Sequence, residues 1–270
     1  MSPLITFLTD FGLEDDFVGT CHGVIAGIAP EARVIDITHG IRPGHVLQAA
    51  LVLANVLPYM PSGVHLAVVD PGVGGARRAL ALRDGEGRLH VGPDNGLLLP
   101  AAERFGGVAA VHELANPAYS IQPVSRTFHG RDLFSPAAAH LAAGVTLEEL
   151  GPPLAPDELV RVEVPKPEVG RSRVRATALV VDRFGNIALN LGREHLAHVE
   201  PAPGTRIEIV CRGDRYHAVF ARTFGDAPPG ALIVYEDSYR NLAVAVSRGN
   251  AAQLLRAEEG TELLINLDVA

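Results

Sequence analysis

An alternation of two kinds of segment near the N-terminus constrains the fold more than any other feature. Residues 4–9, 33–38 and 64–70 are short runs of apolar and β-branched side chains, as found in strands that are buried on both faces. Residues 16–28 and 46–57 lie between these runs and have the length and apolar spacing of helices. This order of strand, helix and strand predicts a mostly parallel sheet covered by helices.

The same part of the chain continues with a predicted hairpin. Residues 79–83 and 89–92 flank the turn Asp84-Gly85-Glu86-Gly87, which favours two antiparallel strands. Further elements are expected from the apolar spacing, namely helices at 97–105 and 133–143 and a strand at 109–113.

The character of the sequence changes between residues 151 and 170, where five prolines gather and apolar periodicity stops. We therefore expect an α/β N-terminal domain over 1–155, a linker over 156–171 and a smaller β-rich domain over 172–270. The turns of the last part are too short to hold crossover helices, which predicts a small antiparallel β-barrel or sandwich. Its expected strands are 172–181, 186–191, 206–211, 216–222, 231–235 and 242–247.

Composition and charge exclude several classes of protein. The chain has 270 residues, of which 47% are hydrophobic and 20% charged, so it can bury a sizeable core. A net charge of −8 without a basic cluster disfavours nucleic-acid binding. The first apolar run stops at Asp10 and has no basic residues before it. We therefore expect neither a signal peptide nor a membrane span, and a cytoplasmic location.

Carboxylates end two of the predicted parallel strands. Asp10 follows the run at 4–9 and Asp70 ends the run at 64–70. Because sheets of this kind bind ligands at the carboxyl ends of their strands, these two residues are the first candidates for a site. The alternative is that each one caps the next turn or helix. That simpler interpretation is adopted for Asp36 and Asp94.

Asp70 opens a glycine-rich loop with the sequence DPGVGGARR. The loop is not a phosphate-binding loop, because a helix must follow such a loop and residues 78–83 alternate like a strand. Its glycines allow the backbone to approach a ligand and allow Arg77 to fold back over Asp70. A guanidinium in that position keeps the carboxylate ionised and fixes its orientation.

His129 lies in the segment TFHGRD, just before a predicted helix. By itself it could be a general base, a metal ligand or an ordinary satisfied histidine. A metal site built from His129, Asp70 and the histidines at 22, 39 and 45 is the alternative to a metal-free site. Neither a nucleophilic serine motif nor a reactive cysteine context supports covalent catalysis.

Three turns of the C-terminal half combine acidic or amide residues with aromatic ones, at residues 182–186, 223–226 and 237–241. As hairpin turns they need no further function. Phe184 and Phe224, however, stand out in a chain that is 5% aromatic and has no tryptophan. An aromatic ring can stack on a planar heterocycle while a neighbouring amide reads its edge, so these loops suit such a ligand.

Taken together, six segments resemble the S-adenosyl-L-methionine hydroxide adenosyltransferases, the hydrolase relatives of the fluorinase and chlorinase enzymes. They occur in the family's order and span nearly the whole chain. The segments are LTDFGLEDDFVG at 8–19, VVDPGVGGAR at 68–77, GPDNGLL at 92–98, TFHGRDLFSPAAAHLA at 127–142, VDRFGNIALN at 181–190 and GNAAQLL at 249–255.

The resemblance implies cleavage of S-adenosyl-L-methionine by water into adenosine and L-methionine, with no cofactor and no metal. Asp70, Arg77 and His129 match the family's catalytic set. We hypothesise that they position one water or hydroxide in line with the C5′–S bond. The halogenating relatives carry other residues where Asp70 and His129 stand, so halide use is disfavoured.

The resemblance also assigns the substrate-binding residues. Asp10 holds the ribose diol, while adenine is surrounded by Phe184, Asn186, Phe224 and the backbone near Ala251. The amino-acid end of the substrate falls to Asp182 and Ser238, with Asp15. Fluorinase has an arginine directly after the equivalent of Ser238, whereas this chain has Tyr239 and then Arg240. The group that pairs with the methionine carboxylate is therefore left open.

Family members bind substrate between the sheet domain of one subunit and the small β domain of its neighbour, so the resemblance implies a homotrimer. Two alternatives to a metal-free hydrolase are kept. One is a metal-dependent hydrolase. The other is a nucleoside-binding or sensing module, which the aromatic C-terminal loops fit equally well.

Overall fold

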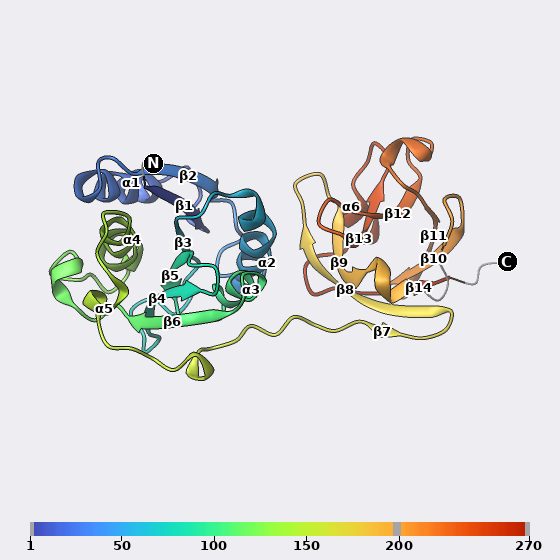
Figure 1. The fold of residues 1–270 in the computed structure, drawn as a ribbon. Helices are drawn as coiled ribbons and strands as arrows, with labels where there is room; N and C mark the ends of the chain where they lie inside the picture. Colours follow the sequence, from blue (N-terminus) through green and yellow to red (C-terminus); the bar gives the residue numbers. More distant parts are fainter. Residues whose placement is uncertain (1–2, 197–200, 268–270) are drawn as a thin grey trace. The chain divides into compact units, whose positions relative to one another are not determined.

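The computed structural model describes residues 3–196 and 201–267. The chain divides into two compact units (Figure 1), one ending at Glu163 and the other beginning at Val164. This division falls inside the segment 156–171, where the sequence places the linker. None of the described helices is long and apolar enough to cross a membrane.

A six-stranded sheet forms the centre of the first unit. Its strands lie in the order β2-β1-β3-β5-β4-β6. β1 is parallel to β2 and β3, and β3 is parallel to β5, whereas β4 is antiparallel to both of its neighbours. The predicted mostly parallel sheet is therefore confirmed. The strands are β1 (Leu4–Thr9), β2 (Arg33–Thr38), β3 (Val64–Val68), β4 (Ala79–Asp84), β5 (Leu89–Pro93) and β6 (Val108–Glu113).

Helices cover both faces of this sheet (Figure 1). α1 (Phe17–Ile28) and α4 (Ser135–Ala142) pack on one face, and α2 (Val46–Val56) and α3 (Leu99–Arg104) on the other, while α5 (Leu147–Leu150) precedes the linker. Successive residues of β3 alternate between the two cores: Val64, Leu66 and Val68 face α1 and α4, and Ala67 faces α2 and α3. Burial on both faces explains why four of the five residues of the strand are apolar, with His65 as the exception.

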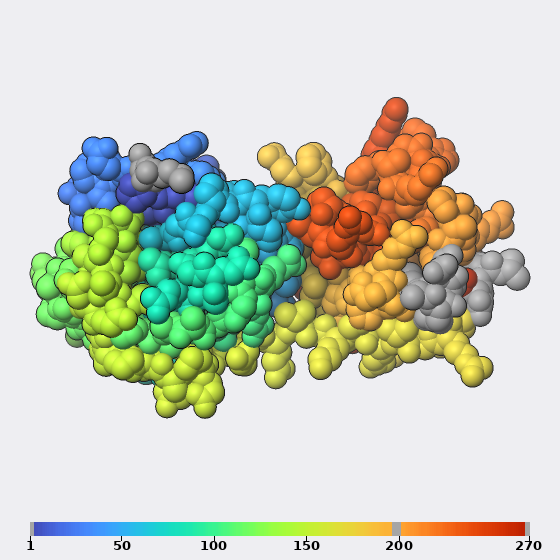
Figure 2. Space-filling view, in the orientation of Figure 1, coloured from blue at the N-terminus to red at the C-terminus, as the bar shows by residue number. Residues whose placement is uncertain are grey.

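The surface of the first unit mixes distant parts of the chain. In Figure 2 its blue, cyan and green segments adjoin one another on the visible face. The fold therefore brings together residues that the sequence keeps far apart.

The helix expected over 133–143 has an irregular start. A π-helical turn over Gly130–Phe134 comes first, and α4 follows with a proline near its beginning. Pro136 has no amide hydrogen, so it cannot make the regular helical hydrogen bond back to the preceding turn. The wider turn accommodates this loss just after His129.

The second unit is a closed β-barrel. Seven strands pair in the order β14-β10-β11-β12-β13-β9-β8, and β14 pairs with β8 to close the ring. They are β8 (Arg173–Val181), β9 (Ile187–Gly192), β10 (Arg206–Cys211), β11 (Asp214–Phe220), β12 (Leu232–Glu236), β13 (Asn241–Val246) and β14 (Glu262–Asn266), with the short β7 (Glu168–Val169) beside β8.

The barrel core is built by alternation of inward- and outward-facing residues. Leu242, Val244 and Val246 of β13 point inward, as do every second residue of the other strands. α6 (Ala251–Leu255) adds Ala251 and Leu255 to the same core. This period of two is the pattern that predicted strands in this half.

The barrel departs from the expected structure in two ways. β11 and β12 are parallel, whereas the other neighbouring strands of the ring are antiparallel. The connection over residues 221–231 is long enough to return the chain to the same end of the barrel without a crossover helix. In addition, β7, β14 and α6 were not predicted. β7 has two residues and α6 has five, which is too short for a periodic signal.

Candidate active site

Asp70, Arg77 and His129 meet at the carboxyl end of β3. Arg77 Nε donates to both carboxylate oxygens of Asp70, at 2.9 and 3.0 Å, and its Nη2 donates to Oδ2. The same Nη2 lies 2.6 Å from Nδ1 of His129. The side chains of Arg77 and Asp70 are only 12% and 6% exposed, so this is a partly buried, bidentate ion pair with an imidazole attached.

Two glycines of the loop make this arrangement possible. A Cβ on Gly72 would lie 3.2 Å from Arg77 Cγ, so the glycine makes room for the guanidinium to turn back. Gly74 has a φ of +74°, and a Cβ there would lie 2.2 Å from the carbonyl oxygen of Arg126. The loop therefore packs directly against the segment that carries His129, as only glycine allows.

The contact with Arg77 fixes the protonation of His129. A guanidinium has no acceptor and stays protonated, so Nδ1 must accept and the ring hydrogen is on Nε2. Burial lowers the pKa of His129, the positive charge of Arg77 lowers it further, and the Asp70 carboxylate offsets these effects only in part. His129 is therefore a neutral imidazole at neutral pH.

Asp10 lies on the same edge of the sheet, since it follows β1, the parallel neighbour of β3. Its Oδ2 accepts the backbone N–H of Gly44 at 2.8 Å. A Cβ on Gly44 would lie 3.7 Å from Cβ of Pro71, so Gly44 sits against the residue that follows Asp70. The structure thus places Asp10 beside the start of the loop that Asp70 opens. The predicted Asp15, in contrast, is an exposed residue before α1.

Three phenylalanines that the sequence analysis did not select line this region. The ring centroids of Phe11 and Phe128 are 6.0 Å apart, and Phe17 is 6.0 Å from Phe11 and 5.0 Å from Phe128. Phe11 follows Asp10 and Phe128 precedes His129. Their positions next to Asp10 and His129 in the sequence were the signal from which they could have been predicted. A Cβ on Gly130 would lie 2.9 Å from the Phe11 ring, so this packing needs a glycine there.

On the barrel, Asp182 organises the turn between β8 and β9. Its Oδ1 accepts the backbone N–H groups of Phe184 and Asn186, each at 2.9 Å, and its Oδ2 accepts the Asn186 side-chain amide at 2.8 Å. The carbonyl of Gly185 accepts from Ala252 N–H at 2.9 Å. The turn is therefore docked on α6 beside Ala251, and the Phe184 ring stays 70% exposed.

The turn between β12 and β13 repeats the same design. Asp237 Oδ1 accepts the backbone N–H groups of Tyr239 and Asn241, at 2.8 and 2.9 Å. Ser238 and Tyr239 form its tip, and the Tyr239 side chain is 42% exposed. These two predicted residues thus lie in a turn separate from that of Asp182.

Phe224 occupies a third loop, where its ring packs 4.9 Å from Tyr235. It lines a hollow of about 480 Å³ together with residues 225–229, 247 and 248. Tyr235 was not predicted, because it looked like an ordinary strand residue. Burial, and after it the charges of Asp237 and Asp182, raise the pKa of Tyr235 to about 12. Tyr235 therefore contacts the loop of Phe224 and lies within electrostatic range of the other two turns.

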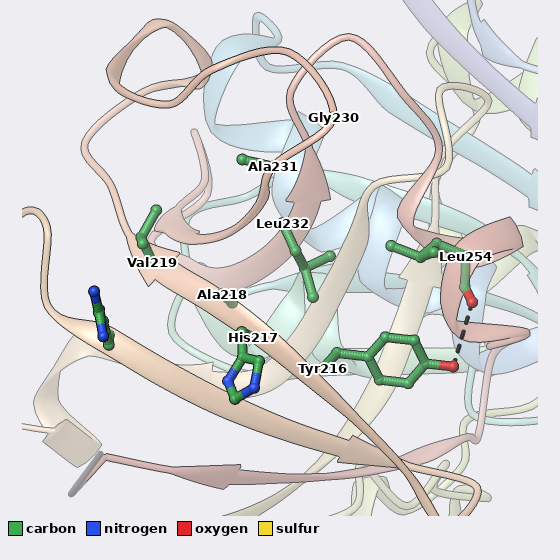
Figure 3. A pocket seen from close by; sticks show the side chains of 9 residues that line it. Tyr216, His217, Ala218, Val219, Gly230, Ala231, Leu232 and Leu254 are labelled. Atoms are coloured by element: carbon green, nitrogen blue, oxygen red, sulfur yellow. Dashed lines mark hydrogen bonds between the residues drawn. The ribbon is translucent and has the colours of Figure 1, made fainter. Parts of the chain in front are cut away.

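A larger hollow of about 600 Å³ lies beside the parallel pair β11 and β12 of the barrel (Figure 3). Tyr216 donates from its hydroxyl to the Leu254 carbonyl at 3.4 Å along one side of it. None of the predicted site residues is among those that line it. The lining residues are Arg206, Tyr216, His217, Ala218, Val219, Gly230, Ala231, Leu232 and Leu254.

Three of the four histidines of the alternative metal site are divided between two places. His129 contacts Arg77, whereas His22 and His39 meet at Asp36. Within 3–196 and 201–267, the group His22, Asp36 and His39 is the one place where three such side chains come close enough to share an ion. Asp36 therefore does more than cap a turn. Asp94, in contrast, accepts from Arg78 Nε and Val160 N–H and so has the structural role expected of it.

A polar site at the carboxyl edge of an α/β sheet, followed by a small β-barrel with aromatic loops, defines a two-domain class of protein. The chain belongs to the SAM hydroxide adenosyltransferase family, whose N-terminal domain matches residues 5–151 and whose C-terminal domain matches residues 176–264.

Individual relatives agree with this family. A protein from Salinispora arenicola named (R)-S-adenosyl-L-methionine hydrolase is 50% identical over 98% of both chains. A fluorinase from Nocardia brasiliensis is 28% identical over 98% of this chain and 97% of its own. Among solved structures, an uncharacterized conserved protein from Thermotoga maritima superposes with a TM-score of 0.89 at 38% identity, over 97% of this chain and 99% of its own.

Proposed function

We propose that this protein hydrolyses S-adenosyl-L-methionine to adenosine and L-methionine. The observation that carries the proposal is the contact of Asp70, Arg77 and His129 at the carboxyl edge of the sheet. The proposal is supported by the 50% identity to a relative named (R)-S-adenosyl-L-methionine hydrolase, against 28% to one named fluorinase.

In the proposed reaction, a water oxygen attacks C5′ of the ribose from the side opposite the sulfonium. The O–C5′ bond forms as the C5′–S bond breaks, and the bonding electron pair goes to sulfur, which leaves as the neutral thioether of methionine. The water proton is shared with Asp70 and passes to solvent. Because the sulfonium leaves without being protonated, the enzyme needs to supply only a well-oriented nucleophile.

The three side chains have different roles in this step. The Arg77 charge stabilises the negative charge that develops on the attacking oxygen. The Asp70 carboxylate accepts a hydrogen bond from the water and takes up the water proton as the oxygen attacks. His129 has its Nδ1 lone pair engaged by Arg77, so it positions the guanidinium and does not act as a base.

The rest of the substrate is assigned to the loops described above. We assign the ribose diol to the Asp10 carboxylate, which can accept both hydroxyl protons, and adenine to Phe184, Asn186, Phe224 and the backbone at Ala251. The methionine end falls to Asp182, Ser238 and Tyr239, with Asp15. The exposed Phe184 ring supports this proposal, because stacking on a heterocycle would cover it.

We also propose that the protein is a homotrimer with the barrel of one subunit completing the site of the next. Sedimentation at assay concentration tests this, since a fully active monomer contradicts a shared site. The cytoplasmic location stays a prediction, to be checked by fractionating cells of the source organism.

Hydrolysis is tested by incubating chelator-treated protein with S-adenosyl-L-methionine in ¹⁸O-labelled water. One ¹⁸O atom in the adenosine 5′-hydroxyl is expected. Activity that is lost on chelation and restored by zinc or manganese would instead favour a metal-dependent hydrolase. Tight adenosine binding without steady turnover would favour a nucleoside-binding or sensing module.

A further inference from the structure

A second polar cluster lies in the first unit, between α1 and the sheet edge formed by β2. His22 Nε2 is 2.9 Å from Asp36 Oδ1, and His39 Nε2 is 3.2 Å from the same oxygen. One ligand atom from each side chain lies within 4.8 Å of the other two. The proposed hydrolysis uses none of these residues.

We propose that His22, Asp36 and His39 bind a divalent first-row transition-metal ion of the zinc class. Such ions bind imidazole nitrogen and carboxylate oxygen at about 2.0–2.2 Å, which places neighbouring ligand atoms roughly 3 Å apart. The distances of 2.9 and 3.2 Å match this spacing. Two imidazoles and one carboxylate suit zinc, iron, nickel or copper better than magnesium or calcium, which prefer oxygen ligands.

The state of His39 argues for an ion over a simple hydrogen-bonded cluster. Its side chain is 3% exposed, and its Nε2 is buried without a hydrogen-bond partner. The nearest acceptor atom is Asp36 Oδ1 at 3.2 Å, and it does not complete a hydrogen bond with this nitrogen. Buried polar nitrogens are rarely left in this state, and a metal ion would satisfy this one.

The other ring nitrogen of His39 is held in the way expected of a metal ligand. Its Nδ1 lies 2.8 Å from the Thr9 hydroxyl, and such outer contacts fix the orientation of ligating imidazoles. The His22 and Asp36 side chains are 36% and 43% exposed, which leaves an entry path for the ion and room for water as a further ligand.

An ion at this place would connect three elements of the first unit. His22 lies on α1 and Asp36 on β2, while the carbonyl of His39 accepts the Gly12 N–H at 2.8 Å, just beyond Asp10. Bound metal would therefore stabilise the segment that carries Asp10 without taking part in the reaction. We expect the metal to affect stability, since a ligand that binds only the folded state raises the melting temperature.

The test is a calorimetric titration of chelator-treated full-length protein with zinc, with cobalt absorption spectra as a second measurement. We expect one equivalent of zinc per chain and a higher melting temperature. His22→Ala and Asp36→Asn should weaken binding by at least about tenfold, and Thr9→Val by roughly tenfold. His217→Ala changes an exposed histidine on β11 and should leave binding intact.

Circular dichroism verifies that each variant is folded. Absence of saturable zinc binding in the unaltered protein overturns the proposal, and so does equal binding by the His22 and Asp36 variants. Turnover by metal-free protein, measured in parallel, keeps the two proposals separate. If zinc binds at this cluster and is also required for turnover, the metal-free hydrolysis fails while the metal site stands.

Discussion

Arg77 Nη2 and His129 Nδ1 lie 2.6 Å apart, although the two residues are 52 positions apart in the sequence. Because the guanidinium can only donate, this contact makes the imidazole an acceptor at Nδ1 and a donor at Nε2. The imidazole lone pair is therefore occupied, and the carboxylate of Asp70 remains as the acceptor among the three groups.

The first prediction concerns the loss of these groups. Asp70→Asn should lower kcat by on the order of 100-fold or more, because it removes the group that accepts the water proton. His129→Ala should lower kcat by on the order of 100-fold, because Arg77 loses the contact that positions it. Both variants should change KM much less, since neither group binds the substrate directly. Arg77→Lys should also be impaired, since an ammonium cannot bind the carboxylate in bidentate fashion. His140→Ala, on α4, serves as a control. Wild-type turnover in the first two variants would remove these residues from the mechanism.

The titration of His129 provides a second prediction. Burial and the Arg77 charge lower its pKa below 6.5, so the neutral form needed for the contact is present at neutral pH and is lost only as the pH falls through this lowered value. Asp70→Asn should lower the pKa further, because a carboxylate that raises it is removed. Nitrogen-15 spectra of histidine-labelled protein measure both values. A His129 pKa above 6.5 is incompatible with this assignment.

Asp10 should control the affinity for adenosine. Replacing it with alanine leaves the ribose diol unpaired, at a cost of about 1–3 kcal/mol, which corresponds to a loss of roughly 5- to 150-fold in affinity. Titration calorimetry with adenosine measures this loss. Asp157→Ala, an exposed carboxylate in the linker, is the matched control. Because Asp10 also holds the Gly44 N–H, melting curves must show that the variant is folded, and wild-type affinity would refute the role.

Gly74 and Gly87 form a matched pair for testing the loop. Both have positive φ, +74° and +87°, but a Cβ on Gly74 would meet the Arg126 carbonyl at 2.2 Å, whereas a Cβ on Gly87 meets nothing within 4 Å. Gly87→Ala should therefore cost only backbone strain, about 1 kcal/mol. Gly74→Ala should cost more and should also reduce turnover. Urea unfolding and activity assays measure both effects, and equal behaviour of the two variants would contradict the close packing.

Acid should destabilise the first unit through buried histidines. His65 bonds to the Thr6 hydroxyl at 2.9 Å and lies beside His90, which bonds to Asp84. Burial lowers the pKa of His65 from 6.5 to about 3. The unfolded chain thus binds a proton that the native protein excludes, and the free energy of unfolding falls as the pH drops from about 6.5 towards 3.

A paired substitution tests this origin of the acid sensitivity. Thr6→Val with His65→Leu removes both polar partners together, so neither is left unsatisfied. The slope of unfolding free energy against pH should then decrease by about 1.4 kcal/mol per pH unit, the contribution of one proton. Urea unfolding followed by circular dichroism between pH 4 and 7 measures the slope. An unchanged slope would assign the acid sensitivity to other groups.

Much of this structure follows from local sequence patterns. Burial on both faces makes β1 and β3 mostly apolar runs, and the carboxyl ends of such strands place Asp10 and Asp70 on one edge. The glycines after Asp70 also predicted the return of Arg77, because that contact closes a short loop. Alternation predicted most of the barrel strands for the same reason.

Contacts between distant segments could not be predicted in this way. Nothing in the spacing near His129 indicates that its ring reaches Arg77; only the resemblance to a family placed the two together. Asp36 looked like a cap because His22, its partner on α1, lies 14 positions away in the sequence. The parallel pairing of β11 and β12 depends on how the chain crosses the barrel end, which short-range periodicity does not encode.

The reversed direction of β4 has a consequence for how new chemistry could arise on this scaffold. β4 runs opposite to β3, so the chain leaves the sheet at Asp70 and re-enters it just after Arg77 at the same edge. The two charged groups therefore lie on one short loop and pair with each other there. The third group, His129, lies on a separate segment of the chain. Redirecting the site toward another nucleophile would therefore require changes on both pieces, at Asp70 and at His129.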